Sequence, residues 1–252
     1  MKVVAIQHDI CWEDREATLS TLAPVVADVA PGADLVVLAE MFAVGFTMDT
    51  GAVAESPEGP TTQWLVDQAA RHDAWIAGSA PIVMPGADRP SNVLVLTSPE
   101  GTVHRYAKRH PFSFAGEHEH YLPGDKRVTV DIRGMRVSPT VCYDLRFADS
   151  FTPIAQDTDL YLVVASWPSS RQAHWDALLP ARAIENQAYV LGVNRVGDGG
   201  GLSYGGGTCI VDPTGQVVGA PAGECTLDAD LDPARVAAVR AEFPFLADRR
   251  SD

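Results

Sequence analysis

The sequence is poor in lysine, has no closely paired cysteines and contains no long apolar run. Lys2, Lys108 and Lys126 are the only lysines among 252 residues, so arginine carries most of the positive charge. The net charge is −14 at pH 7, which argues against nucleic acid and against an anionic membrane surface as partners. No apolar run approaches the roughly 20 residues that a membrane-spanning helix needs, so we expect no membrane partner.

The four cysteines, Cys11, Cys142, Cys209 and Cys225, lie far apart in the chain. This spacing argues against a disulfide framework and against a zinc ribbon, and it suits a reducing compartment. The apolar segment 1–7 is too short, and too soon followed by polar residues, to be a signal peptide. We therefore expect a cytoplasmic protein.

Segments with strand and helix patterns alternate along the chain, and the same order occurs twice. In the first half we expect strands over 3–7, 34–39 and 74–80, helices over 14–29 and 61–71, and a hairpin of 92–97 and 102–107. In the second half we expect strands over 135–141, 159–165 and 188–196, helices over 146–156 and 171–187, and a hairpin of 208–211 and 216–220. A last strand is predicted over 225–231 and a last helix over 233–243.

The two halves also resemble each other in sequence, although any α/β protein contains similar strings. Segment 1–7 matches 135–141, and segment 34–39 matches 159–165. Two such halves predict an α/β fold of two mixed sheets packed face to face with helices outside, a four-layer α-β-β-α sandwich with two pseudo-symmetric halves. The length suits a single domain over residues 1–252, and 46% hydrophobic residues are enough for a large core.

Cys142 directly follows the predicted strand 135–141. A thiol at the end of a strand is held rigidly and points into the crevice beyond the sheet, which is a common location of active sites. Taken alone, the local sequence favours a buried structural cysteine, because free cysteine is among the most buried residue types. Three residues elsewhere in the chain reverse this interpretation.

Glu40, Lys108 and Glu117 also end predicted strands or lie in the loop between the halves. Each has an ordinary interpretation of its own, as a surface carboxylate or a solvated lysine. Beside Cys142, however, a carboxylate can accept the thiol proton and later activate water. A lysine and the backbone N–H of Tyr143 can stabilise an oxyanion, and a second carboxylate can orient an amide. The set predicts attack of a thiolate on an unactivated C–N carbonyl group.

Segments 38–42, 106–110 and 141–147, together with Glu117, resemble the Glu-Lys-Cys signature of the carbon–nitrogen hydrolase (nitrilase) superfamily. The resemblance covers nearly the whole chain, and three motifs in the right order and spacing are a specific signal. It implies the α-β-β-α fold, a covalent thioester intermediate and a homodimer or larger assembly. We expect neither a metal nor another cofactor.

The resemblance also implies a role for each motif residue. Glu40 is expected to be the general base, Lys108 the oxyanion stabiliser and Cys142 the nucleophile. Glu117 matches the family's second glutamate, seven residues before Gly124.

Within the superfamily, several strings look most like the omega-amidase branch. These strings are 40–48, 108–110, 117–121, 165–168 and 181–187. That branch hydrolyses the terminal amide of 2-oxoglutaramate or 2-oxosuccinamate and gives the 2-oxo dicarboxylate and ammonia. Pro111, Ala148 and Ser166 depart from the usual residues of the branch, which bears on the details of the substrate pocket but removes no catalytic group.

Aromatic residues near the motifs are predicted to wall the substrate pocket. They are Phe42, Phe46, Tyr143 and Trp167, and each could equally be a core residue. The pocket is expected to bind a small amide.

The far carboxylate of such a substrate needs a cation, which must be local in a protein of this net charge. Arg146, Arg109 and Arg171 are the candidates. Arg146 stays among the predicted substrate-binding residues, although its recurrence across branches with different substrates favours a framework role.

Other functions stay open at this point. Amidases, carbamoylases and nitrilases share Glu-Lys-Cys, so another small C–N substrate is the first alternative. A metal-dependent phosphoesterase is the second alternative, in which Cys142 would have no catalytic role. Its metal ligands would be His118, Glu119, His120, Asp9 and His110. A non-catalytic relative is the third, and the presence of all four catalytic residue types argues against it.

The glycine-rich segment 197–207 resembles a phosphate-binding loop only superficially, because no Gly-Lys-Ser or Gly-Lys-Thr follows. We expect it to be a mobile loop near the entrance of the site.

Overall fold

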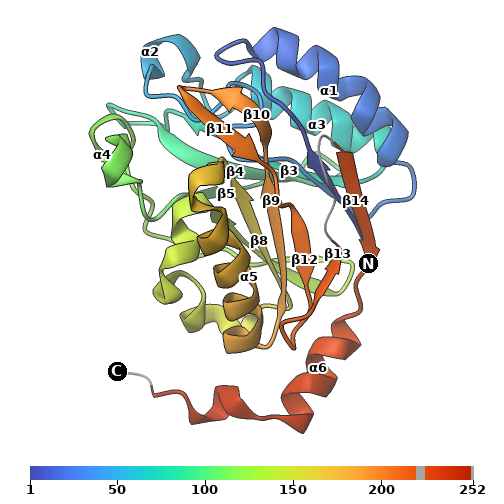
Figure 1. The fold of residues 1–252 in the computed structure, drawn as a ribbon. Coiled ribbons are helices and arrows are strands. Elements are labelled where there is room, and N and C mark those ends of the chain that lie inside the picture. The colour runs from blue at the N-terminus through green and yellow to red at the C-terminus, as the bar shows by residue number, and fades with distance from the viewer. Residues whose placement is uncertain (220–224, 251–252) are drawn as a thin grey trace.

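Two six-stranded sheets form the centre of the computed structural model, which describes residues 1–219 and 225–250 (Figure 1). The first sheet has the order β14 (Cys225–Asp230), β1 (Lys2–Gln7), β2 (Leu35–Val37), β3 (Trp75–Ile82), β4 (Ser91–Thr97) and β5 (Val103–Ala107). The second has the order β13 (Val217–Gly219), β12 (Cys209–Val211), β9 (Tyr189–Asn194), β8 (Leu160–Ala165), β7 (Met135–Val141) and β6 (Val130–Ile132). β10 (Val196–Gly199) and β11 (Leu202–Gly205) form a separate hairpin.

The two sheets have the same internal arrangement. β1, β2 and β3 are parallel, and β4 and β5 continue the sheet antiparallel to their neighbours. β7, β8 and β9 are likewise parallel, and β12 and β13 continue antiparallel. The repeated order of elements is therefore confirmed as two pseudo-symmetric halves.

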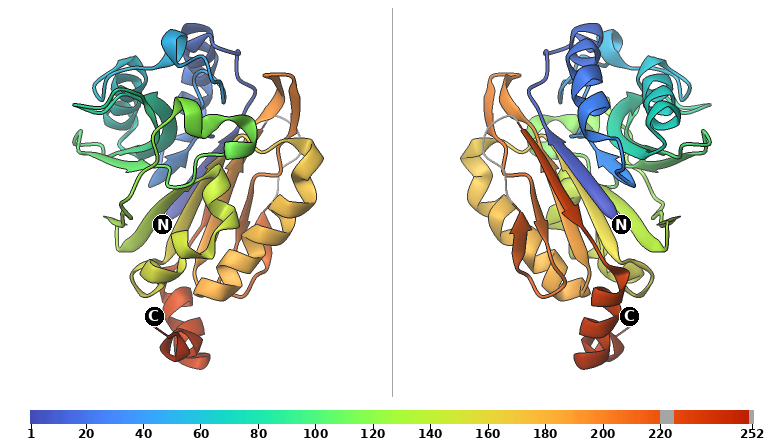
Figure 2. Two further views of the ribbon diagram at one scale, coloured as in Figure 1. Left: turned by 90° about the vertical axis from the view of Figure 1, so that its left-hand side faces the viewer. Right: turned by 90° about the vertical axis from the view of Figure 1, so that its right-hand side faces the viewer.

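Helices cover the outer face of each sheet, as Figure 2 shows for α1 and α3 on one side and α5 on the other. The α-helices are α1 (Arg15–Val29), α2 (Thr50–Val53), α3 (Pro60–His72), α4 (Glu117–His120), α5 (Gln172–Asn186) and α6 (Pro233–Glu242). Short 3₁₀ turns occupy Ser113–Ala115, Cys142–Arg146, Ala148–Ser150, Thr152–Asp157, Ser169–Arg171 and Phe245–Asp248. None of the helices in the described part of the chain is long and apolar enough to cross a membrane.

The core follows from the alternation of side chains along each strand. In β1, Val3 and Ala5 face the second sheet, whereas Val4 and Ile6 pack in the layer that contains α1 and α3. β8 is buried on both faces in the same way, between the first sheet and α5. Strands that are buried on both sides need the continuous apolar runs seen in the sequence, which confirms the four-layer sandwich.

Two predicted elements are wrong. The predicted helix 146–156 is a series of 3₁₀ turns, broken at Phe147, which is extended. Pro153 lies inside the predicted helix and has no N–H to donate to a carbonyl one turn earlier, and it instead lies in the first turn of the segment Thr152–Asp157. The predicted loop 197–207 is largely the β10–β11 hairpin.

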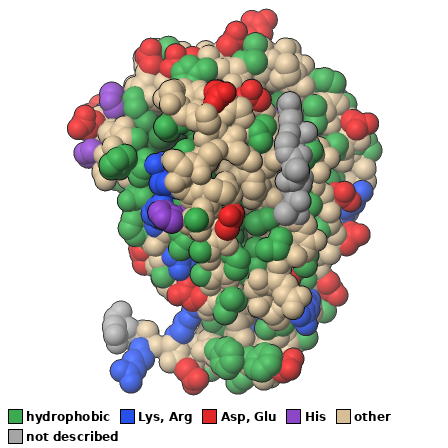
Figure 3. All heavy atoms as spheres, viewed as in Figure 1, with side chains coloured by type: hydrophobic (Ala, Val, Ile, Leu, Met, Phe, Trp, Pro, Cys, Tyr) green, Lys and Arg blue, Asp and Glu red, His purple; other side chains and the backbone are tan. Residues whose placement is uncertain are grey.

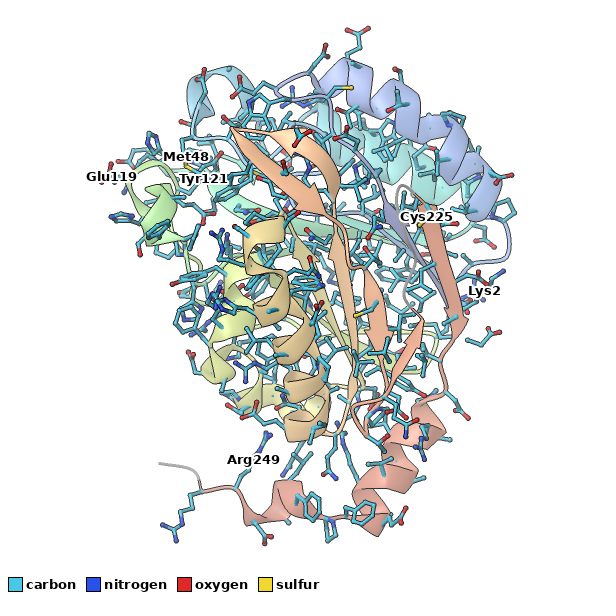
Figure 4. The ribbon with its side chains drawn as sticks, in the orientation of Figure 1. Lys2, Met48, Glu119, Tyr121, Cys225 and Arg249 are labelled. Carbon is cyan, nitrogen blue, oxygen red and sulfur yellow. The ribbon has the colours of Figure 1, made fainter. Side chains whose placement is uncertain are left out.

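α6 and the turn after it extend below the rest of the molecule (Figure 1). Arg249 lies beneath α5 in Figure 4 and donates hydrogen bonds to the Thr152 carbonyl, at 3.0 Å, and to the Asn186 side chain, at 3.0 Å. The predicted hairpin end at residue 220 lies outside the described residues.

Candidate active site

The carboxyl ends of parallel strands from both sheets meet at one place. Glu40 comes shortly after β2, Cys142 directly follows β7, and Ser166 directly follows β8. The backbone N–H of Ser166 donates to Glu40 Oε2 at 2.8 Å, so the two sheets are joined at the site itself. Such strand ends are the usual location of active sites in α/β sheets.

Cys142 begins the 3₁₀ turn that follows β7 and has a positive φ of 45°. A positive φ is costly for a residue with a Cβ and persists only where the surrounding structure enforces it. The sharp turn leaves Cys142 partly exposed to a pocket, while Leu145 behind it is buried in the core. The conformation therefore presents the sulfur to a ligand.

The carboxylate of Asp144 holds this turn to the segment that carries the lysine. It is fully buried and accepts hydrogen bonds from the N–H groups of Val141, at 3.1 Å, and His110, at 2.9 Å. The Tyr106 hydroxyl donates to it at 2.8 Å, and His110 Nδ1 lies 2.9 Å away. The sequence interpretation missed this role of Asp144. A signal was visible, because Asp144 is a carboxylate only two residues after the cysteine that ends an apolar strand.

Lys108 and two carboxylates form a buried group of three charges. Lys108 Nζ donates to Glu40 Oε1 at 2.9 Å and to Glu117 Oε2 at 2.8 Å. All three side chains are at most 1% exposed. Asn92 Nδ2 donates to Glu40 Oε1 at 2.8 Å, and it is a further member of the group that the sequence interpretation missed. The structure thus brings together the charged residues predicted from motifs far apart in the chain.

Electrostatics in this group keep the thiol protonated. Its enclosed position raises the pKa of Cys142 well above the usual range, and the Glu40 carboxylate, which hydrogen-bonds it, raises the pKa further. Lys108 acts in the opposite direction but is outweighed. A thiol in this state is a poor nucleophile until a base removes its proton, and Glu40 is the carboxylate in contact with it.

Lys108 and Glu117, the two other charged residues of the group, affect each other's pKa. Burial alone would lower the pKa of Lys108, but Glu117 and Glu40 outweigh burial and raise that pKa well above its ordinary value. Burial raises the pKa of Glu117, and Lys108 opposes this shift. Lys108 is therefore a permanent cation beside the sulfur.

Above Cys142 lies a pocket of about 260 Å³. Its aromatic wall consists of Trp12, Phe46, Phe112, Tyr143, Trp167 and Tyr204. Arg146 and Arg171 also line the pocket, and its lining residues include no carboxylate. Figure 3 shows basic and histidine side chains gathered beside the start of α5, on a molecule that is acidic as a whole.

The three candidate arginines differ in position. The Arg146 guanidinium lies 4.7 Å from the centre of the Trp167 ring and contacts His174. Arg171 lies 5.1 Å from the Phe112 ring centre, and no hydrogen bond or ion pair engages its guanidinium within the described part of the chain. Arg109 does not line the pocket and binds the Asp125 carbonyl instead.

Phe42 requires a correction. It is fully buried, its ring is tilted against that of Trp64 with the ring centres 5.7 Å apart, and a Cβ on Gly78 would lie 2.6 Å from it. Because its ring fills the layer between α3 and the first sheet, it does not reach the pocket. Of the four predicted wall residues, Phe46, Tyr143 and Trp167 line the pocket.

The residues considered as metal ligands are not brought together. Asp9 binds Arg195, and His110 binds Asp144. Glu119 lies at the outer edge of α4, in Figure 4 well apart from the centre of the molecule. Residues 1–219 and 225–250 contain no group of three His, Cys, Asp or Glu side chains that could hold a metal ion.

Comparison with known proteins identifies the family. The model of the carbon–nitrogen hydrolase family matches residues 2–241, and the chain belongs to that family. Omega-amidase YafV from Yersinia enterocolitica is 42% identical over 251 residues, which cover 98% of this chain and 96% of that protein. The 2-oxoglutaramate amidase from Bacillus subtilis is 28% identical, over 99% of this chain and 98% of its own.

Comparison with solved structures supports the same family. A CN-hydrolase superfamily protein from Xanthomonas campestris, solved with an arsenic adduct in its active site, has a TM-score of 0.95. It is 36% identical, and the match covers 100% of this chain and 98% of that one. The protein is therefore a hydrolase that acts on C–N bonds, as predicted from the three motifs.

Proposed function

We propose that the protein hydrolyses the terminal amide of a small omega-amidodicarboxylate, such as 2-oxoglutaramate or 2-oxosuccinamate, to the 2-oxo dicarboxylate and ammonia. One observation carries the proposal. The pocket above the Cys142 sulfur contains two arginines and no carboxylate, which suits a substrate with an amide at one end and a carboxylate at the other. The names of the omega-amidase and 2-oxoglutaramate amidase relatives support the same substrate class.

In the first half of the reaction, Glu40 takes the proton of Cys142, and the sulfur attacks the amide carbon. Lys108 and the Tyr143 N–H stabilise the oxyanion that forms. Glu40 then gives its proton to the amide nitrogen, the C–N bond breaks, and ammonia leaves behind a thioester. Glu117 keeps Lys108 in place through the contact at 2.8 Å.

In the second half, water takes the place of ammonia. Glu40 accepts a proton from this water, the hydroxide attacks the thioester carbon, and the C–S bond breaks. The carboxylic acid is released, and the proton returns to the sulfur. One carboxylate serves as base in both halves, so Glu40 must stay beside the sulfur during the whole reaction. The hydrogen bond that its Oε2 accepts from the Ser166 N–H, at 2.8 Å, holds it there.

Arg171 and Arg146 are proposed to bind the far carboxylate. Arg171 is the stronger candidate, because its guanidinium has no other polar partner within residues 1–219 and 225–250. Arg146 also contacts His174, at 3.0 Å, so part of its hydrogen-bonding capacity is used by the framework. Tyr143 and Trp167 are proposed to hold the carbon chain between these cations and the sulfur.

The alternative is a related amidase, carbamoylase or nitrilase with another small C–N substrate. Release of ammonia from 2-oxoglutaramate, glutamine, N-carbamoyl amino acids and aliphatic nitriles separates the two. The proposal predicts the highest kcat/KM for 2-oxoglutaramate, and activity confined to nitriles or carbamoyl compounds would reject it.

We further propose that residues 1–252 are one catalytic domain that assembles as a homodimer in the cytoplasm. The family match over residues 2–241 supports the single domain. Sedimentation velocity at micromolar concentration tests the dimer, which should sediment with twice the mass of 26.9 kDa.

A further inference from the structure

The β10–β11 hairpin forms one wall of the pocket and rests on a buried cation. Arg195, just before β10, is fully buried, and its Nη2 donates to Asp9 Oδ1 at 2.8 Å. A Cβ on Gly197 would lie 2.1 Å from the Asp9 carboxylate, and one on Gly199 would lie 2.5 Å from the Trp12 ring. The hairpin can therefore sit this close only with glycine at these positions.

Tyr204 projects from this hairpin into the wall of the pocket. It pairs with Gly197 across the hairpin, lines the same pocket as Cys142 and Arg171, and is only 5% exposed. Its ring lies 4.5 Å from the Arg195 guanidinium carbon. Within residues 1–219 and 225–250 its hydroxyl makes no hydrogen bond, and it is not among the polar atoms that are sealed from solvent, so it is open to the pocket. A ligand in the pocket can supply the missing acceptor.

The charges around Tyr204 make its hydroxyl a donor. Burial raises the pKa of Tyr204 to about 12, while Arg195 opposes that shift and Glu40 and Cys142 add to it. The phenol therefore stays protonated at neutral pH. Arg171, also close enough to influence this phenol, and Arg195 are both cations, so a positive group on the ligand would be disfavoured here.

We propose that Tyr204 is a specificity-determining residue that donates a hydrogen bond to the 2-oxo oxygen of the substrate. The inference rests on the proposed function, in which the carboxylate next to that oxygen binds Arg171. A carbonyl oxygen satisfies the hydroxyl, whereas the α-ammonium group of glutamine offers no acceptor and meets two cations. The pocket thus selects 2-oxo acid amides over amino acid amides.

The test compares two substrates in two proteins. 2-Oxoglutaramate and glutaramate differ only in the 2-oxo group, and Tyr204→Phe removes only the hydroxyl. The variant should lose about threefold to tenfold in kcat/KM for 2-oxoglutaramate, as expected for one neutral hydrogen bond, and less than about twofold for glutaramate. A structural disturbance of the pocket would lower both values equally, and that result would overturn the proposal.

Tyr161→Phe is the matched control, since Tyr161 is a buried tyrosine outside the pocket whose hydroxyl donates to the Phe151 carbonyl at 2.8 Å. It should lower the melting temperature without changing the ratio of the two kcat/KM values. If the wild-type protein releases no ammonia from either amide, the proposed function fails and this inference with it. Hydrolysis of both amides with an unchanged ratio in Tyr204→Phe rejects the inference alone.

Discussion

The buried charges beneath Cys142 and the arginines in the pocket above it differ in almost every physical respect. Glu40, Lys108 and Glu117 are excluded from solvent, and Lys108 contacts both carboxylates. Arg146 and Arg171 line an open pocket and stack on aromatic rings. In the proposed function, the buried group serves the bond-breaking steps and the pocket arginines select the substrate. Mutations should separate the two.

The largest effect is expected for Glu40→Gln. The variant keeps the shape of the side chain but cannot accept the thiol proton, so kcat should fall by about 10²- to 10⁴-fold. Steady-state ammonia release measures this loss, and circular dichroism checks that the fold is retained. Glu119→Gln is the control, because Glu119 is an exposed carboxylate outside the buried group. Near-normal turnover in Glu40→Gln would show that another group is the base.

Arg171→Gln should instead affect binding. Loss of a charge-assisted hydrogen bond should raise KM for 2-oxoglutaramate by about tenfold or more, with a smaller change in kcat. For butyramide, which has no carboxylate, KM should stay nearly constant. Arg109→Gln is the matched control, since this arginine does not line the pocket. If KM rose equally for both substrates, Arg171 would not act on the carboxylate, and the pocket arginines would not have a role distinct from that of the buried charges.

Asp144→Asn probes the link between the cysteine turn and the lysine segment. An amide in place of the carboxylate turns an NH₂ group toward donors such as the Val141 N–H, so one hydrogen bond is lost. We expect kcat to fall about tenfold with little change in KM. Asp159→Asn removes a buried carboxylate bound to Arg136 at 2.7 Å, away from the site, and should affect thermal stability only. Identical kinetic losses in both variants would make Asp144 purely structural.

The smallest effect concerns the reactivity of the thiol. Because burial and Glu40 raise the pKa of Cys142, its alkylation by iodoacetamide at pH 7 should be slower than that of an ordinary thiol and should accelerate as the pH rises. Glu40→Gln removes a negative charge beside the sulfur, which lowers this pKa. Alkylation at pH 7 should then be a few-fold faster although turnover is slower. Mass spectrometry of the Cys142 peptide measures this rate, and slower alkylation in the variant would contradict the electrostatics.

The meeting of the charged residues at Cys142 was predictable from the sequence to a greater extent than the walls of the pocket. Glu40, Lys108 and Cys142 each lie at or near the end of a strand, and strand ends converge in this architecture, so their meeting could be expected. Asn92 gave no such signal, because its contact with Glu40 depends on the register of β4 beside β5.

Pocket walls depend on segments whose positions no periodic pattern determines. Tyr204 lies on a glycine-rich hairpin that the sequence suggested was a mobile loop, and Trp12 lies in a turn before α1. Phe42 illustrates the reverse error, since an aromatic residue next to a catalytic motif packs outward into the helix layer. Apolar character alone does not distinguish a pocket wall from a core residue.

The role of Cys142 as nucleophile is decided by ammonia release from 2-oxoglutaramate by Cys142→Ala, measured beside Cys11→Ala. Cys11 is exposed and does not line the pocket, so its variant should match the wild-type rate. We expect Cys142→Ala to lose turnover while its melting temperature stays close to that of the wild type. Substantial ammonia release by the folded Cys142→Ala protein would contradict this role.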